Sequence, residues 1–207
     1  YPEASRLYKE DDDFKFNAQK INKELNENKK ELINYWENIR KISVKAIKET
    51  LLLLDHSFDL WMGESDVNGL IEPMIHDLKD NKKISIDNGA YISNLETEPK
   101  ILITKSDGSY LYLTTDLATV LNRKKENNVD RTLYIVDKRQ KLHFQQLFDS
   151  INYFQFGNEE YTHVEFGTVN DLNGNPLKTR DGDTKKLIDL FKETLFKIQN
   201  VNKDLDE

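Results

Sequence analysis

The sequence contains no cysteine, so disulfide bonds and cysteine-ligated metal sites are excluded, and the composition fits a reducing compartment. No apolar run approaches the roughly 20 residues that span a membrane, and the four leucines of 51–54 illustrate how short these runs are. The opening residues, YPEASRLYKEDDDF, lack the apolar stretch of a secretory signal. These absences predict a cytoplasmic location, with no membrane partner and no metal centre.

The net charge of −7 argues against a broad nucleic-acid-binding surface. Local basic clusters at 122–125, 138–141 and 178–186 could still contact phosphates, although a solvated surface is the plainer interpretation of each. With 207 residues, of which 37% are hydrophobic and 32% charged, the chain can form one large or two small domains with a heavily charged surface.

The first half of the chain divides into two segments. Residues 1–54 are predicted to be helical, because the acids of DDDF favour a helix start and no glycine or proline intervenes between 31 and 54. The helical spacing there predicts a core helix or a helical hairpin, and it involves Leu32, Tyr35, Trp36, Ile39, Ile42 and Ala46. Residues 55–100 predict an insertion, with a short helix interrupted near Pro73 and a β-hairpin that turns at Asn88-Gly89.

Residues 101–207 alternate between strand and helix patterns. A strand turning at Asp107-Gly108 is expected to end near Leu113, where Thr114 or Thr115 would cap a helix. A buried strand (131–137), a helix (139–154), a strand (162–169) and a final amphipathic helix (185–198) are expected to follow. This order predicts an α/β fold with parallel strands and a right-handed crossover.

The carboxyl ends of two predicted strands carry polar residues. Tyr112 and Asp116 follow one strand, and Asp137, Gln140 and His143 follow the next. Open parallel sheets bind ligands at this edge, so we expect the two groups to come together. A phenol, an amide and a carboxylate, which is favoured as the anion near a helix start, suit a guanidinium or ammonium ligand. The alternative is structural: the phenol packs and the carboxylate caps a helix.

The loop PLKTRDGDTKKL carries a second candidate site. Lys178 and Arg180 flank Thr179, and Asp181-Gly182 follows. Two cations on a loop of this kind can bind phosphates whose charge redistributes in a transition state. A solvated loop with no ligand is the alternative.

Several segments, taken in order, resemble arginyl-tRNA synthetases, a family of class I aminoacyl-tRNA synthetases. They are YWENIRKISVKAIKETL, FDLWMGES, SDGSYLYLTTDLA, LYIVDKRQKLHFQQ, THVEFGTV and LKTRDGDTKKLIDL, and together they cover nearly the whole chain. The resemblance implies the second half of a Rossmann-type parallel sheet with flanking helices, preceded by an N-terminal helical region and a β-hairpin insertion. The corresponding segments are 1–54, 55–100 and 101–207.

The resemblance also implies an activity and its site. Members of the family adenylate arginine with ATP and Mg²⁺ and pass the arginine to its tRNA. Residues matching the arginine-binding positions are Tyr112, Asp116 and Gln140. Backbone groups of Gly167 to Val169 would border adenine, and Leu177 takes the place of the first lysine of the KMSKS loop. The phosphate-binding residues would be Lys178, Thr179 and Arg180, with Arg180 acting catalytically.

One motif of the family is not found. None of the four histidines, His56, His76, His143 and His163, stands in an H-x-G-H arrangement. We therefore expect an internal piece of the enzyme, inactive alone, whose partners include the missing catalytic half and the anticodon-binding domain. The alternatives are a non-catalytic paralogue that binds arginine or RNA and a different class I synthetase.

Overall fold

A computed structural model describes residues 2–26, 29–126, 129–167 and 187–205 of the chain. The chain forms two compact units, one made of Tyr1–Asp59 with Val169–Glu207 and the other of Leu60–Thr168. No helix in the described ranges is both long and apolar enough to cross a membrane. The second unit holds the two residue groups expected to meet at the sheet edge.

The described part of the first unit is helical, as predicted. Its helices are α1 (Pro2–Glu10), α2 (Asp12–Asn26), α3 (Lys30–Leu52) and α7 (Leu187–Leu205). The acidic stretch starts a helix as expected, because the Asp11 carboxylate accepts a hydrogen bond from the backbone N–H of Phe14 at 2.9 Å.

Of the two predicted alternatives for α3, the core helix is wrong, whereas a hairpin with α2 is compatible with their contact. The helical spacing of α3 is confirmed, but Tyr35, Ile39 and Ile42 are each at least half exposed and no residue of α3 is buried. The helix packs against α2, which is itself largely exposed, and its C-terminal end lies beside Ile188 and Phe191 of α7, so the described neighbours leave its apolar face largely uncovered.

The second unit begins with a 3-10 turn, η1 (Glu64–Val67), and helix α4 (Asn68–Asp80). The expected interruption at Pro73 does not occur, because the helix runs through it. Proline removes one backbone hydrogen bond in the second turn. Burial of the apolar face outweighs this loss, and the buried residues of that face are Ile71, Met74, Ile75 and Leu78.

The predicted β-hairpin is confirmed. Strands β1 (Ile84–Asp87) and β2 (Ala90–Ser93) pair antiparallel, and Asn88 and Gly89 both have positive φ, at 49° and 83°. The next segment reverses direction at Gly108, as expected, with φ at 82°. Its pairing is limited to isolated bridges, from Ile92 to Leu102 and from Thr104 to Tyr110.

Helix α5 (Tyr112–Glu126) begins earlier than the sequence suggested. The expected strand ending near Leu113 is absent, and Thr114 and Thr115 lie inside the first turn instead of capping it. Tyrosine and leucine alternate as in a strand, but Leu113 and Leu117 are also four apart and both are buried. Burial of this helical face overrides the local strand preference.

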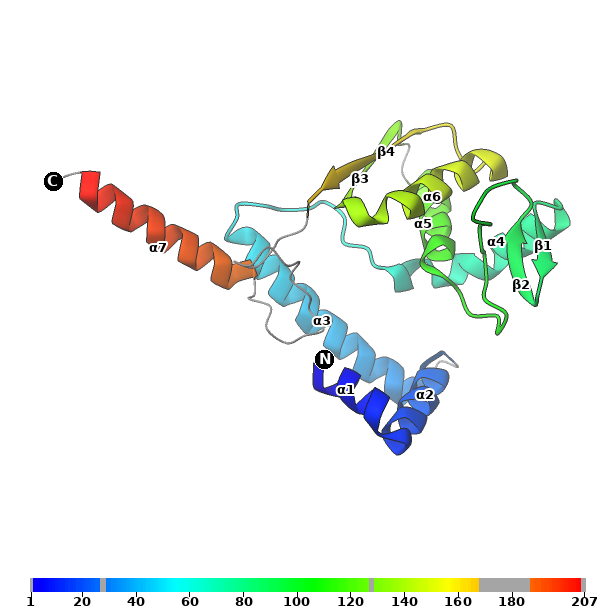
Figure 1. The fold of residues 1–207 in the computed structure, drawn as a ribbon, viewed down its shortest axis with the longest axis horizontal. Helices are drawn as coiled ribbons and strands as arrows, with labels where there is room; N and C mark the ends of the chain where they lie inside the picture. Colours follow the sequence, from blue (N-terminus) through cyan, green and yellow to red (C-terminus); the bar gives the residue numbers. More distant parts are fainter. Residues whose placement is uncertain (1, 27–28, 127–128, 168–186, 206–207) are drawn as a thin grey trace. The chain divides into compact units, whose positions relative to one another are not determined.

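The strand–helix–strand unit of the second half is confirmed. Strand β3 (Arg131–Asp137), the 3-10 turn η2 (Lys138–Gln140), helix α6 (Lys141–Phe154) and strand β4 (Glu160–Phe166) follow in order. The two strands pair in parallel, with Tyr134 opposite His163, and lie side by side in Figure 1.

Among the described residues, helices cover one face of the β3–β4 sheet. Alternate residues Tyr134 and Val136 pack against the core, whereas Leu133 and Ile135 are 51% and 68% exposed. The expectation of a fully buried strand is therefore wrong, because the described residues place helical cover on one face alone. The four exposed apolar residues of the other face are Leu133, Ile135, Val164 and Phe166.

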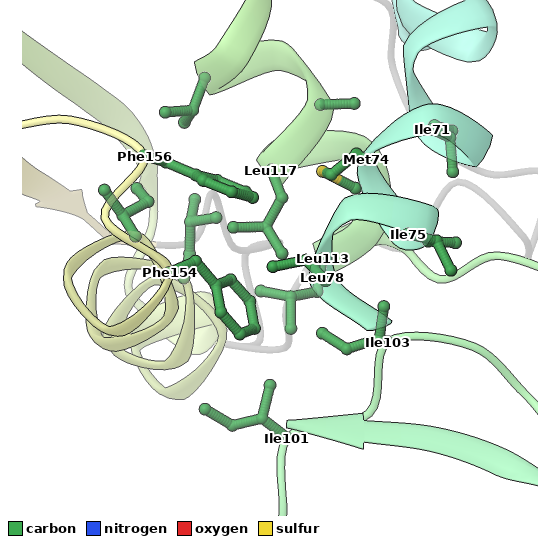
Figure 2. Close-up of a cluster of buried hydrophobic side chains, with 14 of the residues drawn as sticks. Ile71, Met74, Ile75, Leu78, Ile101, Ile103, Leu113, Leu117, Phe154 and Phe156 are labelled. Carbon is green, nitrogen blue, oxygen red and sulfur yellow. The ribbon is translucent and has the colours of Figure 1, made fainter. Parts of the chain in front are cut away.

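The core of the second unit lies where α4, α5, α6 and the segment after the hairpin converge. Figure 2 shows Met74 and Leu78 of α4 beside Leu117 of α5 and Phe154 of α6, with Ile103 completing the cluster. This packing fixes the start of α5 relative to α6, and both helix starts carry candidate site residues.

Candidate functional site

Tyr112 and Asp116 lie on the same face of α5, one turn apart, because the helix begins at Tyr112. The Thr114 hydroxyl between them is fully buried and donates a hydrogen bond to the backbone carbonyl of Ile103. This bond ties the first turn of α5 to the segment that follows the hairpin. The Tyr112 side chain remains free of the core, and the residue is 74% exposed.

The other half of the site follows β3. Asp137 is the last residue of the strand, and its carboxylate accepts hydrogen bonds from the backbone N–H of Arg139 at 2.8 Å and from the Arg139 guanidinium at 3.0 and 2.9 Å. These hydrogen bonds hold the pKa of the Asp137 carboxyl below its usual range. Asp137 therefore shapes the turn into α6, and its charge is already paired.

One residue of each group meets, although the strand expected before Asp116 is absent. His143, the third residue of α6, places Nε2 at 2.7 Å from Asp116 Oδ2. The two side chains are 25% and 33% exposed, so the contact is partly shielded from water. Sequence reasoning placed His143 at this edge but gave it no role, since chain order does not reveal which atoms touch.

Gln140 lies one turn before His143, at the N-terminal end of α6, and is exposed. Within the described part of the chain, neither Gln140 nor Tyr112 makes a side-chain hydrogen bond to the Asp116–His143 pair. Both precede a member of that pair by one helical turn. Their polar groups are thus available near an ionisable carboxylate.

An aromatic cluster supports this edge from the sheet side. The Tyr134 ring lies 4.9 Å from the ring of Phe144 and 5.7 Å from that of Phe148, measured between centroids. The Tyr134 hydroxyl accepts a hydrogen bond from Arg123 at 3.2 Å, and burial raises the pKa of Tyr134 above its usual value. The cluster holds β3 against α6 and so fixes the direction in which α6 presents His143.

Most of the residues expected to bind ATP lie outside the described ranges. Gly167 is described and exposed, and a side chain there would meet no atom within 4 Å. The remaining four expected residues, Val169, Lys178, Thr179 and Arg180, lie outside the described residues. In the described ranges, no group of three or more acidic or histidine side chains is arranged to hold a metal ion.

Comparison with known proteins was made on sequence and on fold. The family model of class I tRNA synthetases specific for arginine, catalytic domain, matches residues 1–206. An arginine–tRNA ligase of Francisella tularensis subsp. novicida is 39% identical over 197 residues, which is 93% of this chain and 34% of the relative. One from Alkaliphilus oremlandii is 36% identical over 217 residues, covering 100% of this chain and 37% of the relative.

A solved structure shares the fold. The arginyl-tRNA synthetase of Plasmodium falciparum matches with a TM-score of 0.71 at 24% sequence identity, over 98% of this chain and 36% of that protein. The chain thus spans about a third of the length of the curated relatives it matches. The fold, with its helices and small parallel sheet, is that of a class I synthetase, and the chain belongs to the catalytic-domain family of class I arginyl-tRNA synthetases.

Proposed function

We propose that this chain is the portion of an arginine–tRNA ligase that binds arginine and the phosphates of ATP, for formation of arginyl-adenylate and transfer of arginine to its tRNA. Family membership over residues 1–206 supports the reaction. The observation that carries the arginine site is the 2.7 Å contact that brings Asp116 of α5 to the start of α6, at the edge of a parallel sheet. In this proposal the sheet is the second half of a Rossmann-type fold.

Asp116 is the proposed recognition group for the cationic end of arginine. A carboxylate offers about four lone-pair positions, and a guanidinium can use two of them through parallel hydrogen bonds. In the described residues, His143 is the hydrogen-bond partner of the Asp116 side chain, so acceptor positions remain for a ligand. Tyr112 and Gln140, each one turn earlier, are assigned to flank the substrate.

ATP is assigned to the residues that follow β4. Backbone groups of Gly167 to Val169 would border adenine, as the family resemblance implies. Lys178, Thr179 and Arg180 would bind the phosphates, with Arg180 stabilising the charge that develops during adenylate formation. Mg²⁺ on the phosphates, the arginine tRNA, the remaining catalytic half, the anticodon-binding domain and a cytoplasmic location belong to the same proposal.

Arginine-dependent exchange of pyrophosphate into ATP, measured with the complete ligase that contains this chain, tests the function. Arginine should support exchange, whereas citrulline, which has a similar shape but no charge, should lower kcat/KM by about a hundredfold or more, because the Asp116 carboxylate would be desolvated by the bound substrate without gaining a cationic partner. Equal exchange with citrulline would contradict recognition by a carboxylate. Arginine binding without any exchange would support a non-catalytic paralogue instead.

A further inference from the structure

The imidazole of His143 is held in place before any ligand binds. Its ring meets the ring of Phe144 edge-on, with centroids 5.1 Å apart and an interplanar angle of 85°. Phe144 is only 5% exposed and packs against Tyr134, so the aromatic cluster limits how far the imidazole can move. A ring fixed in this way presents Nε2 in one direction, toward Asp116.

The contact with His143 restricts the Asp116 carboxylate in turn. An aspartate side chain has two rotatable bonds, and its direction matters when a planar guanidinium must meet both oxygens. Within the described ranges, His143 supplies the hydrogen bond that selects one orientation. The contact uses Oδ2 and leaves further lone pairs on both oxygens.

Two carboxylates near the same edge show why the type of partner matters. Asp137 is paired with the guanidinium of Arg139, and this cation compensates its charge. The guanidinium of Arg139 engages both oxygens of Asp137, whereas the imidazole of His143 contacts only Oδ2 of Asp116. The structure therefore separates a carboxylate used for local folding from one that stays available for a cationic ligand.

We propose that His143 is a positioning residue for arginine recognition: it orients the Asp116 carboxylate toward the guanidinium while leaving acceptor positions on both carboxylate oxygens for the substrate. This inference rests on the proposed function. It predicts that His143 affects arginine binding through Asp116 and has little effect on ATP binding. Groups that orient a functional side chain commonly contribute 10- to 100-fold, as with the partners of metal-bound histidines, and about tenfold is expected here.

The test uses the complete ligase with substitutions at three positions. His143→Leu removes the N–H donor, whereas His143→Gln keeps an amide N–H at a similar distance from the main chain. His76→Leu is the matched control. Like His143, His76 of α4 contacts an aspartate, but this partner is Asp80 of the same helix, at 3.1 Å on an exposed surface. Pyrophosphate exchange gives KM for arginine and for ATP separately, and each melting temperature reports folding.

The expected result is an arginine KM raised about tenfold by His143→Leu and largely restored in His143→Gln, with the ATP KM changed less than twofold. His76→Leu should leave both constants unchanged. In an Asp116→Ala background no carboxylate remains to be oriented, so adding His143→Leu should change the arginine KM less than twofold.

Three results would overturn the inference. The first is an unchanged arginine KM in His143→Leu, and the second is an equal rise of the arginine KM and the ATP KM in that variant. The third is a double variant in which His143→Leu raises the arginine KM as much as it does when Asp116 is present. If Asp116→Ala itself left the arginine KM unchanged, the proposed function of Asp116 would fail as well. If Asp116→Ala raised the arginine KM and His143→Leu did not, only the positioning role of His143 would be refuted.

Discussion

Thr114 connects the position of the candidate site to the core. Its hydroxyl is fully buried and donates to the Ile103 carbonyl, so the start of α5 is anchored by a polar contact within an apolar cluster. Tyr112 lies in the same turn and Asp116 one turn later. A single hydroxyl thus contributes both to stability and to the placement of the proposed arginine-binding residues.

Replacing Thr114 by valine should lower the free energy of unfolding by roughly 1–3 kcal/mol, because the Ile103 carbonyl loses a buried partner while the side-chain shape is kept. Thr119→Val is the control. The Thr119 hydroxyl bonds to the Thr115 carbonyl at 2.9 Å within the same helix, so its removal should cost less than about 0.5 kcal/mol. Urea unfolding curves of the two variants measure the difference, and equal losses would contradict the anchoring role of Thr114.

Two glycines with room for a side chain should respond to alanine in opposite directions. Gly108 has φ of 82°, and an added Cβ there meets nothing within 4 Å, so Gly108→Ala should cost about 1 kcal/mol through the backbone alone. Gly69, in the first turn of α4, has equal space and no positive φ, so Gly69→Ala should stabilise by up to roughly 1 kcal/mol. Chemical denaturation compares them, and the same sign for both would refute this reasoning.

At the scale of elements, local signals predicted the turns well. Asn88-Gly89 indicated a hairpin because both residues accept positive φ, and the strand–helix–strand order indicated the parallel pair of β3 and β4. The start of α5 was predicted wrongly, because Leu113 fits a strand by alternation and a helix by its spacing to Leu117. Only tertiary burial decides between them, and α4 continues past Pro73 for the same reason.

The sequence predicted that Asp116 and His143 lie close together, but for a reason that holds only in part. His143 follows β3 of the parallel pair as expected, whereas the strand expected before Asp116 is absent, and Asp116 reaches His143 because α5 packs beside α6. The Nε2–Oδ2 contact was not predictable, since it depends on how the rings of Phe144 and Tyr134 fix α6 against β3.

The uncovered face of the β3–β4 sheet should promote self-association of the isolated chain. Leu133 and Ile135 are exposed there, and contiguous apolar surface on a short sheet favours pairing with a second copy. Ile135→Thr should lower the average mass measured by light scattering at high concentration. Ile86→Thr is the control, because Ile86 of β1 is similarly exposed, 65% against 68%, but lies in the other sheet. A wild-type chain that stays monomeric would exclude this expectation.

At the scale of the whole molecule, the chain represents only part of the proposed enzyme. It spans about a third of the relatives it matches, and its four histidines include no H-x-G-H arrangement. The 207-residue chain alone is expected to show no pyrophosphate exchange. Each missing preorganised contact to ATP costs about a hundredfold or more in rate, and several would be missing. Robust exchange by the purified chain, with arginine, ATP and tRNA present, would disprove this prediction.

The most direct test of arginine recognition is an arginine titration of the complete ligase carrying Asp116→Asn. The substitution keeps the shape of the side chain and removes its charge. If Asp116 pairs with the substrate, arginine affinity should fall by about 2–5 kcal/mol, while the ATP KM and the melting temperature change little. If the residue only holds α5 to α6 through His143, the free energy of unfolding should fall by about 0.5–1.5 kcal/mol. In that case KM and kcat for arginine would be unchanged, and this outcome would contradict the account.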